Sequence, residues 1–383
     1  MEYRWIEDIR EFQAIATEWD QTLCRRRGDN PFLLSDFILA WWKYYHDDLR
    51  LRILVVSERG ALVGGLPLFL RCGNWFRGFA RTLCYIGAGV ANYTEPLWEM
   101  EEANILPLLL DALGVRNDWD ILHLSDIREG TPLVTGYRTI TESKWPRPYL
   151  TQDHMNWAIN LAAGKDAYLA TVSKKLRRDL RSKRRYVVKN YGPLKLKSIN
   201  GRQQVAHYFD LYRAFSLKAF TARSRQSNFK SPKYADFFRE FLVLMDQAQR
   251  LDAHVLFAGD KELAISFGYR IGRGFNWVLT GFDYDFWYVR PGYLLIEDLI
   301  EEITNRGDLY YNWYGHDRFY KSQWCNEQTP LYRLFLINRT FRGLCGKMSR
   351  RIEMRLRSCR PLVSVARRVK GLTTGTAKFA STL

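Results

Sequence analysis

The sequence lacks the patterns that identify metal sites, disulfide frameworks and membrane spans. None of its six cysteines forms a CxxC pair or stands at ligand spacing from a histidine. No apolar run approaches the ~20 residues that a helix needs to cross a bilayer, and the first residues show no basic-then-apolar signal peptide. We therefore expect a cytoplasmic protein without a metal centre or disulfides. The cysteines are Cys24, Cys72, Cys84, Cys325, Cys345 and Cys359.

A P-loop and a GxGxxG fingerprint are also missing, which argues against a nucleoside triphosphate or a nicotinamide cofactor. An acidic surplus is missing too, because the formal net charge is +17. Nine basic residues and one acidic residue lie in 174–189, and eleven and one lie in 341–383. The rest of the chain is nearly neutral, so the isoelectric point by itself does not predict a nucleic-acid-binding fold.

Each basic segment has a functional and a plain interpretation. The helix expected at 174–185 is either a solvated helix or a contact for an anionic acceptor, a CoA phosphate or a tRNA. Residues 341–370 interleave apolar side chains with arginine and lysine, a pattern that can lie on the anionic inner face of a membrane. The same segment could instead be disordered or pack against the body of the protein.

The length of 383 residues and the hydrophobic content of 47% favour two or three domains, or one large duplicated domain. Residues 53–71 and 254–272 both read as strand, tight turn, strand. Each is followed by a further strand, a loop, a helix and a closing strand. Because the order agrees beyond the hairpin, we infer a tandem duplication of one α+β unit, although two unrelated meanders would look similar.

A Pro-Gly pair precedes the best-patterned helix of the chain, expected at 292–305. A helix start leaves backbone N–H groups without internal partners, and its partial positive charge favours an anion. We expect the amides of Gly292, Tyr293 and Leu294 to face a pyrophosphate, with Arg290 adding a charge-assisted contact and Pro291 shaping the turn. The plain alternative is a turn with no ligand. Without a nucleotide motif, a CoA thioester is the expected ligand.

The meander, the helix entrance and the following strand together resemble the GNAT acyltransferase fold. Residues 165–335 are most similar to the GNAT group of cellulose and exopolysaccharide biosynthesis clusters, which is related to the Fem-type peptidyltransferases. The resemblance implies a mixed α/β (α+β) fold of tandem GNAT-like units, each a mostly antiparallel sheet flanked by helices. The residues that carry it are Phe282-Asp283, Pro291-Gly292, Gly307, Tyr320-Lys321 and Trp324.

The chain departs from that group at Asn312, where the group carries an aspartate. An amide cannot act as a general base, so the departure brings into question the carboxylate's role or the activity of the chain. At the position where that group usually carries the following glycine, this sequence has His316.

GNAT-type transfer is direct, so it needs a base for the acceptor and a proton donor for the thiolate rather than a covalent intermediate. We expect His316 as the base, Tyr320 as the donor and Asp283 as the group that holds the acceptor amine. Lys321 could pair with a CoA phosphate. Each of these residues could instead have no role in catalysis or binding. His316 would then be a surface histidine, Tyr320 a core residue, Asp283 a capping residue and Lys321 a solvated lysine.

These observations predict an N- or O-acyltransferase that uses acetyl-CoA or another acyl-CoA, with a sugar, lipid or polysaccharide precursor as acceptor. Two alternatives stay open: transfer from aminoacyl-tRNA, as in the Fem-type relatives, and a degenerate GNAT fold that only binds a ligand or partner. The expected domains are 1–160, a degenerate N-terminal half; 161–338, the acyltransferase half; and 339–383, a basic amphipathic tail.

Overall fold

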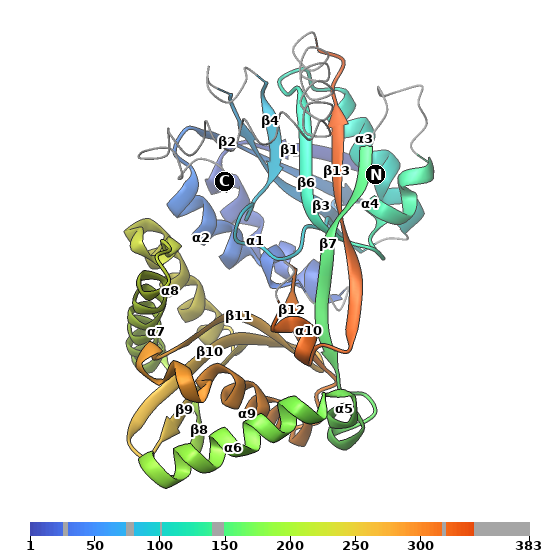
Figure 1. Cartoon of the computed structure of the whole chain (residues 1–383). Helices are drawn as coiled ribbons and strands as arrows, with labels where there is room; N and C mark the ends of the chain where they lie inside the picture. The colour runs from blue at the N-terminus through green and yellow to red at the C-terminus, as the bar shows by residue number, and fades with distance from the viewer. Residues whose placement is uncertain (26–29, 74–79, 100–101, 140–148, 316–318, 341–383) are drawn as a thin grey trace, which may run out of the picture. The chain divides into compact units, whose positions relative to one another are not determined.

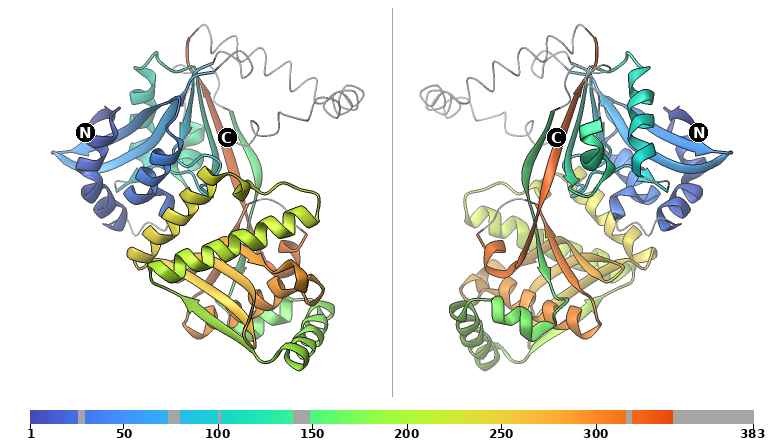
Figure 2. Two further views of the ribbon diagram at one scale, coloured as in Figure 1. Left: turned by 90° about the vertical axis from the view of Figure 1, so that its left-hand side faces the viewer. Right: turned by 90° about the vertical axis from the view of Figure 1, so that its right-hand side faces the viewer.

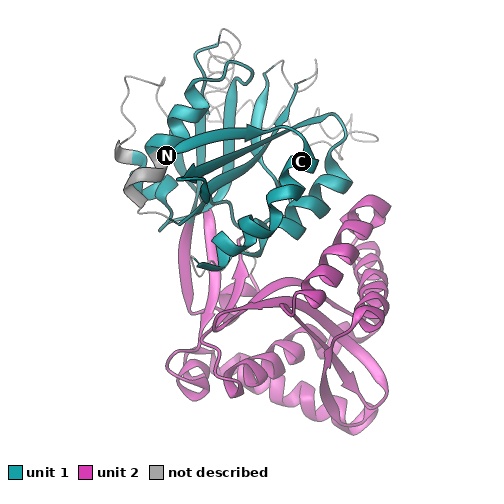
Figure 3. Ribbon diagram, turned by 180° about the vertical axis from the view of Figure 1, so that it is seen from behind, with its two compact units in different colours: residues 1–153, 331–383 teal, residues 154–330 magenta. Residues whose placement is uncertain are grey.

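A computed structural model of the chain divides it into two compact units (Figure 3). Unit 1 contains Met1–Asp153 and the chain from Leu331 onward, and unit 2 is His154–Pro330. The structure describes residues 1–25, 30–73, 80–99, 102–139, 149–315 and 319–340, except for the side chains of 102–106, 138 and 139. The basic segment 341–370 therefore lies outside the described residues.

The units divide the chain at other positions than the expected 160/161 and 338/339. Residues from Leu331 onward return to unit 1 because the second half of the last strand pairs antiparallel with a strand of that unit, Leu331 opposite Arg128 and Ile337 opposite Ile121. Sequence order therefore does not coincide with the structural units at the end of the chain.

The strands of unit 1 follow the spatial order β1-β2-β3-β4-β6-β13 (Figure 1). Its elements are β1 (Glu2–Ile6), α1 (Ile9–Arg25), η1 (Pro31–Leu33), α2 (Ser35–Tyr45), β2 (Leu49–Glu58), β3 (Ala61–Arg71), β4 (Thr82–Tyr85), β5 (Leu97–Trp98), α3 (Glu102–Gly114), β6 (Ile121–Arg128), α4 (Pro132–Thr135), η2 (Gly136–Thr139) and most of β13 (Glu327–Ile337). β5 pairs with β3 beside this path.

The strands of unit 2 follow the order β7-β12-β11-β10-β9-β8. Its elements are β7 (Tyr149–Asn160), which begins in unit 1, α5 (Lys165–Thr171), α6 (Lys174–Tyr191), β8 (Leu194–Ile199), α7 (Arg202–Ala222), η3 (Asn228–Lys230), α8 (Pro232–Gln247), β9 (Leu251–Ala258), β10 (Lys261–Ile271), β11 (Gly274–Phe282), η4 (Tyr284–Val289), α9 (Pro291–Asn305), β12 (Tyr310–Tyr314) and α10 (Lys321–Trp324).

The two units repeat one order of elements. In unit 1 the order is β1-α1-α2-β2-β3-β4-α3-β6, and in unit 2 it is β8-α7-α8-β9-β10-β11-α9-β12. Each has an antiparallel meander followed by a helix and a strand that returns parallel to the last strand of the meander, β6 beside β4 and β12 beside β11. The mixed α/β class and the mostly antiparallel sheets are confirmed.

Helices cover both faces of the unit 2 sheet (Figures 1 and 2). On one face α6 and α9 bury their apolar stripes, including Leu180 and Leu295, against Leu256 of β9. On the other face α7 and α8 pack an aromatic cluster onto the strands. Gly281 makes this possible, because a Cβ there would lie 2.8 Å from the Tyr212 ring of α7. Among the described residues, no helix is long and apolar enough to cross a membrane.

Candidate active site

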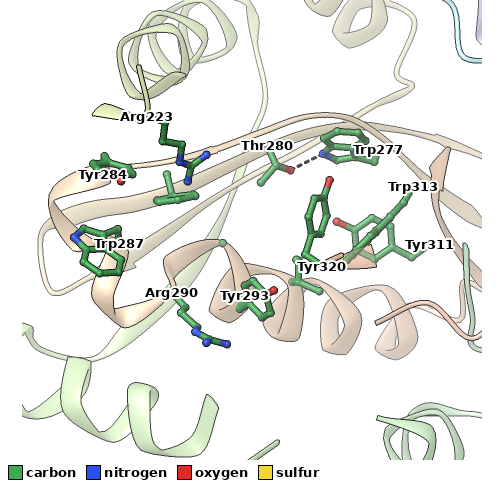
Figure 4. A pocket seen from close by; sticks show the side chains of 13 residues that line it. Arg223, Trp277, Thr280, Tyr284, Trp287, Arg290, Tyr293, Tyr311, Trp313 and Tyr320 are labelled. Carbon is green, nitrogen blue, oxygen red and sulfur yellow. Dashed lines mark hydrogen bonds between the residues drawn. The ribbon is translucent and has the colours of Figure 1, made fainter. Parts of the chain in front are cut away.

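The two parallel strands of unit 2 separate after a short pairing. β11 and β12 are paired only from Gly274–Tyr310 to Asn276–Asn312. Beyond that point β11 stays paired with β10, while β12 follows β7 and bulges between Asn312 and Tyr314. A cavity of about 560 Å³ lies where the strands diverge, and it reaches the start of α9 (Figure 4). Such a position, between splayed strands and beside a helix entrance, is suited to binding an extended ligand.

The cavity is lined mainly by aromatic side chains. Eight of its 13 lining residues are aromatic, and none is acidic. β11, η4, α9, β12 and the segment before α10 contribute them, so residues far apart in sequence meet here. The lining residues are Arg223, Trp277, Thr280, Phe282, Tyr284, Trp287, Arg290, Gly292, Tyr293, Ile296, Tyr311, Trp313 and Tyr320.

The entrance of α9 is poorer in available amides than the sequence predicted. Arg290 is the N-cap in the left-handed conformation, with φ 54° and ψ 55°, and Pro291 has no N–H to offer. The amides of Tyr293 and Leu294 both donate to the carbonyl oxygen of Arg290, at 3.0 and 3.3 Å. Their expected role as phosphate donors is therefore corrected, because the first turn of the helix uses both.

Gly292, unlike Tyr293 and Leu294, still has a backbone N–H that a ligand could use. It lines the cavity, and among the described residues no protein acceptor takes its N–H. A Cβ at this position would meet only the Phe282 ring, at 3.5 Å, which is an ordinary van der Waals contact. The backbone of Gly292 is thus open to the cavity, and the position tolerates a small side chain.

Arg290 lines the same cavity but does not present a free charge to it. Its guanidinium lies 3.1 Å from a carboxylate oxygen of Asp179 in α6 and 5.4 Å from the centre of the Tyr293 ring. The ion pair joins α6 to the entrance of α9. Asp179 therefore offsets part of the positive charge that the sequence assigned to phosphate binding.

Tyr320 is the predicted catalytic residue that the structure places in the cavity. Its ring centre lies 5.7 Å from that of Trp313, with the planes tilted by 43°, and its hydroxyl end points toward Thr280 and Trp277 of β11 (Figure 4). Trp277 itself donates a 2.6 Å hydrogen bond to the Thr280 hydroxyl. A phenol in this position can give a proton to a group bound between the strands.

Asp283 and Lys321, predicted to act on substrates, are engaged in the protein itself. Asp283 caps η4 by accepting from the Asp285 amide at 3.1 Å and pairs with Lys218 at 2.9 Å, and it does not line the cavity. Lys321 is 2% exposed and donates to the carbonyl oxygens of Trp313, Tyr314 and Gly315 at 2.9, 2.9 and 2.5 Å. All three of its protons are used, so it cannot reach a phosphate.

The predicted base, His316, lies outside the described residues, as does the neighbouring Asp317. Cys325 offers no alternative nucleophile. Burial raises the pKa of its thiol to about 12, so it stays protonated at neutral pH. Burial also raises the pKa of Tyr311, deep in the cavity wall, and the pKa of Tyr293. These phenols remain neutral hydrogen-bonding groups.

Asn312 has a structural role that explains why an amide stands there. Its side-chain oxygen accepts the Tyr314 amide at 3.2 Å, which supports the bulge where β12 leaves the sheet. Its side-chain nitrogen donates to the amide oxygen of Asn276 across the parallel pair, at 3.4 Å. A carboxylate could make the first contact but not the second.

A second, basic groove lies on α6, with a volume of about 1040 Å³. Arg184 is held by Glu297 and Asp298 of α9, although the carboxyl of Asp298 has a raised pKa because burial outweighs this pairing. No acidic side chain lines the groove, so it is a strongly positive surface. Its lining residues are Lys174, Lys175, Arg177, Arg178, Arg181, Arg184 and Arg185.

Several cavity residues gave no signal in the sequence. Trp277 and Thr280 looked like ordinary strand residues, and Arg223 follows a helix without any motif. Trp287 is one of three adjacent aromatic residues, a pattern that is more often simple packing. The alternation along β11 could have suggested Trp277, whereas no local pattern could have placed Arg223, because its position depends on how α7 packs.

Comparison with known proteins finds a family match over the segment that contributes the cavity lining. Residues 174–322 match the acetyltransferase (GNAT) domain family. No curated protein matches the chain in sequence.

Solved structures share the overall fold at low sequence identity. FemX is 9% identical over 88% of this chain and 98% of its own, with a TM-score of 0.57. A conserved protein of unknown function from Bacteroides thetaiotaomicron is 14% identical over 88% and 100%, with a TM-score of 0.54. L-PGS from Bacillus licheniformis is 12% identical over 85% and 93%, with a TM-score of 0.52. Residues 174–322, within unit 2, are therefore similar to the acetyltransferase (GNAT) domain family, and the chain shares its fold with FemX.

Proposed function

We propose that this protein transfers an acyl group from an acyl-CoA to an amine or hydroxyl of a sugar, lipid or polysaccharide precursor. The observation that carries the proposal is the aromatic cavity between β11 and β12, which ends at Gly292 and Arg290 of the α9 entrance. An acceptor of the exopolysaccharide class, and work at the inner face of the membrane, are parts of the proposal that rest on the resemblance of the sequence.

The residues present can hold the diphosphate of CoA with one amide and one guanidinium. Gly292 lines the cavity, so its N–H can donate to a phosphate oxygen there, and the partial positive end of α9 adds to this contact. Arg290 can exchange part of its contact with Asp179, 3.1 Å away, for a phosphate oxygen. When bound, an acyl-CoA supplies the activated thioester, and the aromatic walls exclude water from it.

The chemistry requires little from the protein beyond position and one proton. The acceptor nitrogen or oxygen bonds to the acyl carbon, the carbon–sulfur bond breaks, and the acceptor's proton is transferred in net to the sulfur. Tyr320, aimed into the cavity, is the proposed donor to the leaving thiolate. Holding both reactants between the strands supplies much of the rate.

The test is a thermal-shift titration of the full chain with acetyl-CoA, longer acyl-CoAs and CoA, repeated on Gly292→Glu and Gly292→Ala. The glutamate puts an anion where the diphosphate should lie and should abolish the stabilisation. The alanine has room beside Phe282 and should keep it. Gly130→Glu is the matched control, since nothing lies within 4 Å of a Cβ there. Equal shifts in both glutamate variants would reject the site.

The basic groove on α6 favours a second candidate function, transfer from aminoacyl-tRNA. Seven lysine and arginine side chains line one surface beside the entrance of α9, a density that suits a phosphate backbone. Binding of a deacylated tRNA mixture at increasing salt distinguishes the two. A steep fall of affinity with salt, lost in Arg178→Glu, would favour tRNA, whereas stabilisation by acyl-CoA alone would favour the first proposal.

A further inference from the structure

Arg223 reaches the cavity from the side opposite the α9 entrance. It is the residue at which α7 ends, its amide donating to the carbonyl of Phe220 at 3.1 Å. Its guanidinium lies 5.4 Å from the centre of the Tyr284 ring and 6.0 Å from that of Phe282. Figure 4 shows Arg223 and Arg290 on different sides of the cavity, with the guanidinium of Arg290 directed away from Arg223. The ring contacts orient the guanidinium while leaving its N–H groups available.

The charge of Arg223 is not offset by the protein. No ion pair joins it to a carboxylate among the described residues, and no acidic side chain lines the cavity. The carboxylates of Asp283 and Asp285, at the start of η4, pair with Lys218 instead, at 2.9 and 2.5 Å. Arg290, in contrast, has Asp179 as partner. Arg223 is therefore the uncompensated positive charge of the cavity.

The rim beside these residues also presents an apolar surface that a ligand can cover. Trp287, which lines the cavity, is 60% exposed. An exposed indole and an unpaired guanidinium in the lining of one cavity are an unusual combination for a surface without a binding role. Together they offer a flat apolar contact and a fork of hydrogen-bond donors.

We propose that Arg223 binds a negatively charged group of the acceptor, so that the cavity selects acceptors bearing a carboxylate or phosphate. The inference rests on the proposed acyltransferase function and names the class of its second substrate. A cavity lined by one uncompensated arginine and no carboxylate disfavours a simple ammonium substrate, whereas it accepts a hydroxyl or neutral amine carried by an anionic molecule. Arg223 and Arg290 lie on different sides of the cavity (Figure 4), which leaves the α9 entrance to the acyl donor.

The experiment measures binding of paired probes that differ in charge, by calorimetry on the full chain saturated with CoA. The pairs are glucose with glucuronate and glucose 6-phosphate, and glycerol with glycerol 3-phosphate. We expect at least one anionic probe to bind about tenfold or more tightly than its neutral partner, as a charge-assisted bidentate contact allows. The carboxylate and phosphate members separate the two possible anions.

Substitutions assign this preference to Arg223. Arg223→Gln should remove it and Arg223→Lys should retain part of it. Arg225→Gln, at an exposed position outside the cavity lining, should leave it unchanged. Equal binding of charged and neutral probes, no binding of any anionic probe, or a preference that survives Arg223→Gln would each overturn the inference.

A CoA titration of the same proteins separates the two proposals. If CoA stabilises the wild type and Arg223→Gln equally while the probes show no charge preference, the inference fails and the acyltransferase proposal stands. If CoA binds neither protein, the proposed function fails first.

Discussion

The ammonium of Lys321 lies 2.9 Å from the carbonyl oxygen of Trp313, near the end of β12. The same nitrogen also donates to the carbonyls of Tyr314 and Gly315, so one buried charge binds three consecutive carbonyls at the end of β12. Backbone carbonyls without partners are costly when buried. The lysine thus stabilises the wall of the cavity rather than contacting a ligand.

We predict that Lys321→Met lowers the free energy of unfolding by about 2–4 kcal/mol, because it leaves these carbonyls unpaired. Chemical denaturation measures the change. Lys195→Met, at an exposed position of β8, is the control and should change stability by less than about 0.5 kcal/mol. A Lys321→Met protein of unaltered stability that no longer responds to acyl-CoA would restore the ligand role predicted from the sequence.

Replacing Tyr320 with phenylalanine should reduce kcat by roughly 100-fold or more with little change in KM, since the variant loses a proton donor and keeps the aromatic wall. Steady-state kinetics with acetyl-CoA measures it. Tyr293→Phe is the matched control, because the Tyr293 hydroxyl already donates to Gln323 at 2.7 Å and also lines the cavity. Equal effects of the two substitutions would remove Tyr320 from the chemistry.

Introducing a carboxylate at position 312 tests two explanations of Asn312. Either the chain has lost a catalytic base there, or the amide has a structural role. Asn312→Asp should cost about 1 kcal/mol of stability at neutral pH, because it loses the donor to Asn276 and brings a carboxylate toward an amide oxygen. Activity should not rise. A gain in kcat of tenfold or more would instead identify the carboxylate as a base that this chain has lost.

A buried ion network predicts how stability depends on pH. Asp252 contacts His254 at 2.6 Å and pairs with Arg306. Burial alone would raise its pKa, but the hydrogen bonds from His254 and Arg306 outweigh burial and hold the pKa below its usual value. Because the native pKa is lower than the unfolded value of ~3.9, ionised Asp252 stabilises the fold at pH values above ~3.9. This stabilisation disappears as the pH falls through the native pKa.

Asp252→Asn should therefore destabilise the protein most at neutral pH, by roughly 3 kcal/mol, and the difference from wild type should shrink below about pH 4. Denaturation at pH 7, 5 and 3.5 follows it. The exposed Asp260→Asn should show no such pH dependence. A deficit that is constant across this range would mean that packing, not charge, makes Asp252 important.

Local patterns were sufficient to predict the elements that form the site. The stripe of α9 and the Pro291-Gly292 start are visible in sequence, and α9 begins at Pro291 and ends at Asn305, close to the expected helix. The hairpins β2–β3 and β9–β10 were also predictable, because tight turns and apolar alternation are encoded by neighbouring residues. These features depend on interactions over a few residues.

The partners of individual side chains were not predictable in the same way. Asp283 and Lys321 stand at the spacing of a binding motif, yet Lys218 and the carbonyls of β12 occupy them. Which groups a charged side chain meets depends on elements brought together by packing. Motif spacing by itself therefore overestimated the number of residues available to a ligand.

The sequence by itself determined the class of the fold, its repeated order of elements and the helix entrance at Gly292, since periodicity and turn residues act over short distances. Only the tertiary structure decided which surface faces the ligand: the divergence of β11 from β12, the meeting of Arg223 with Tyr284, and the pairing of Arg290 with Asp179. The physical reason is that cavities and ion pairs arise where distant segments pack, and their geometry follows from the whole core.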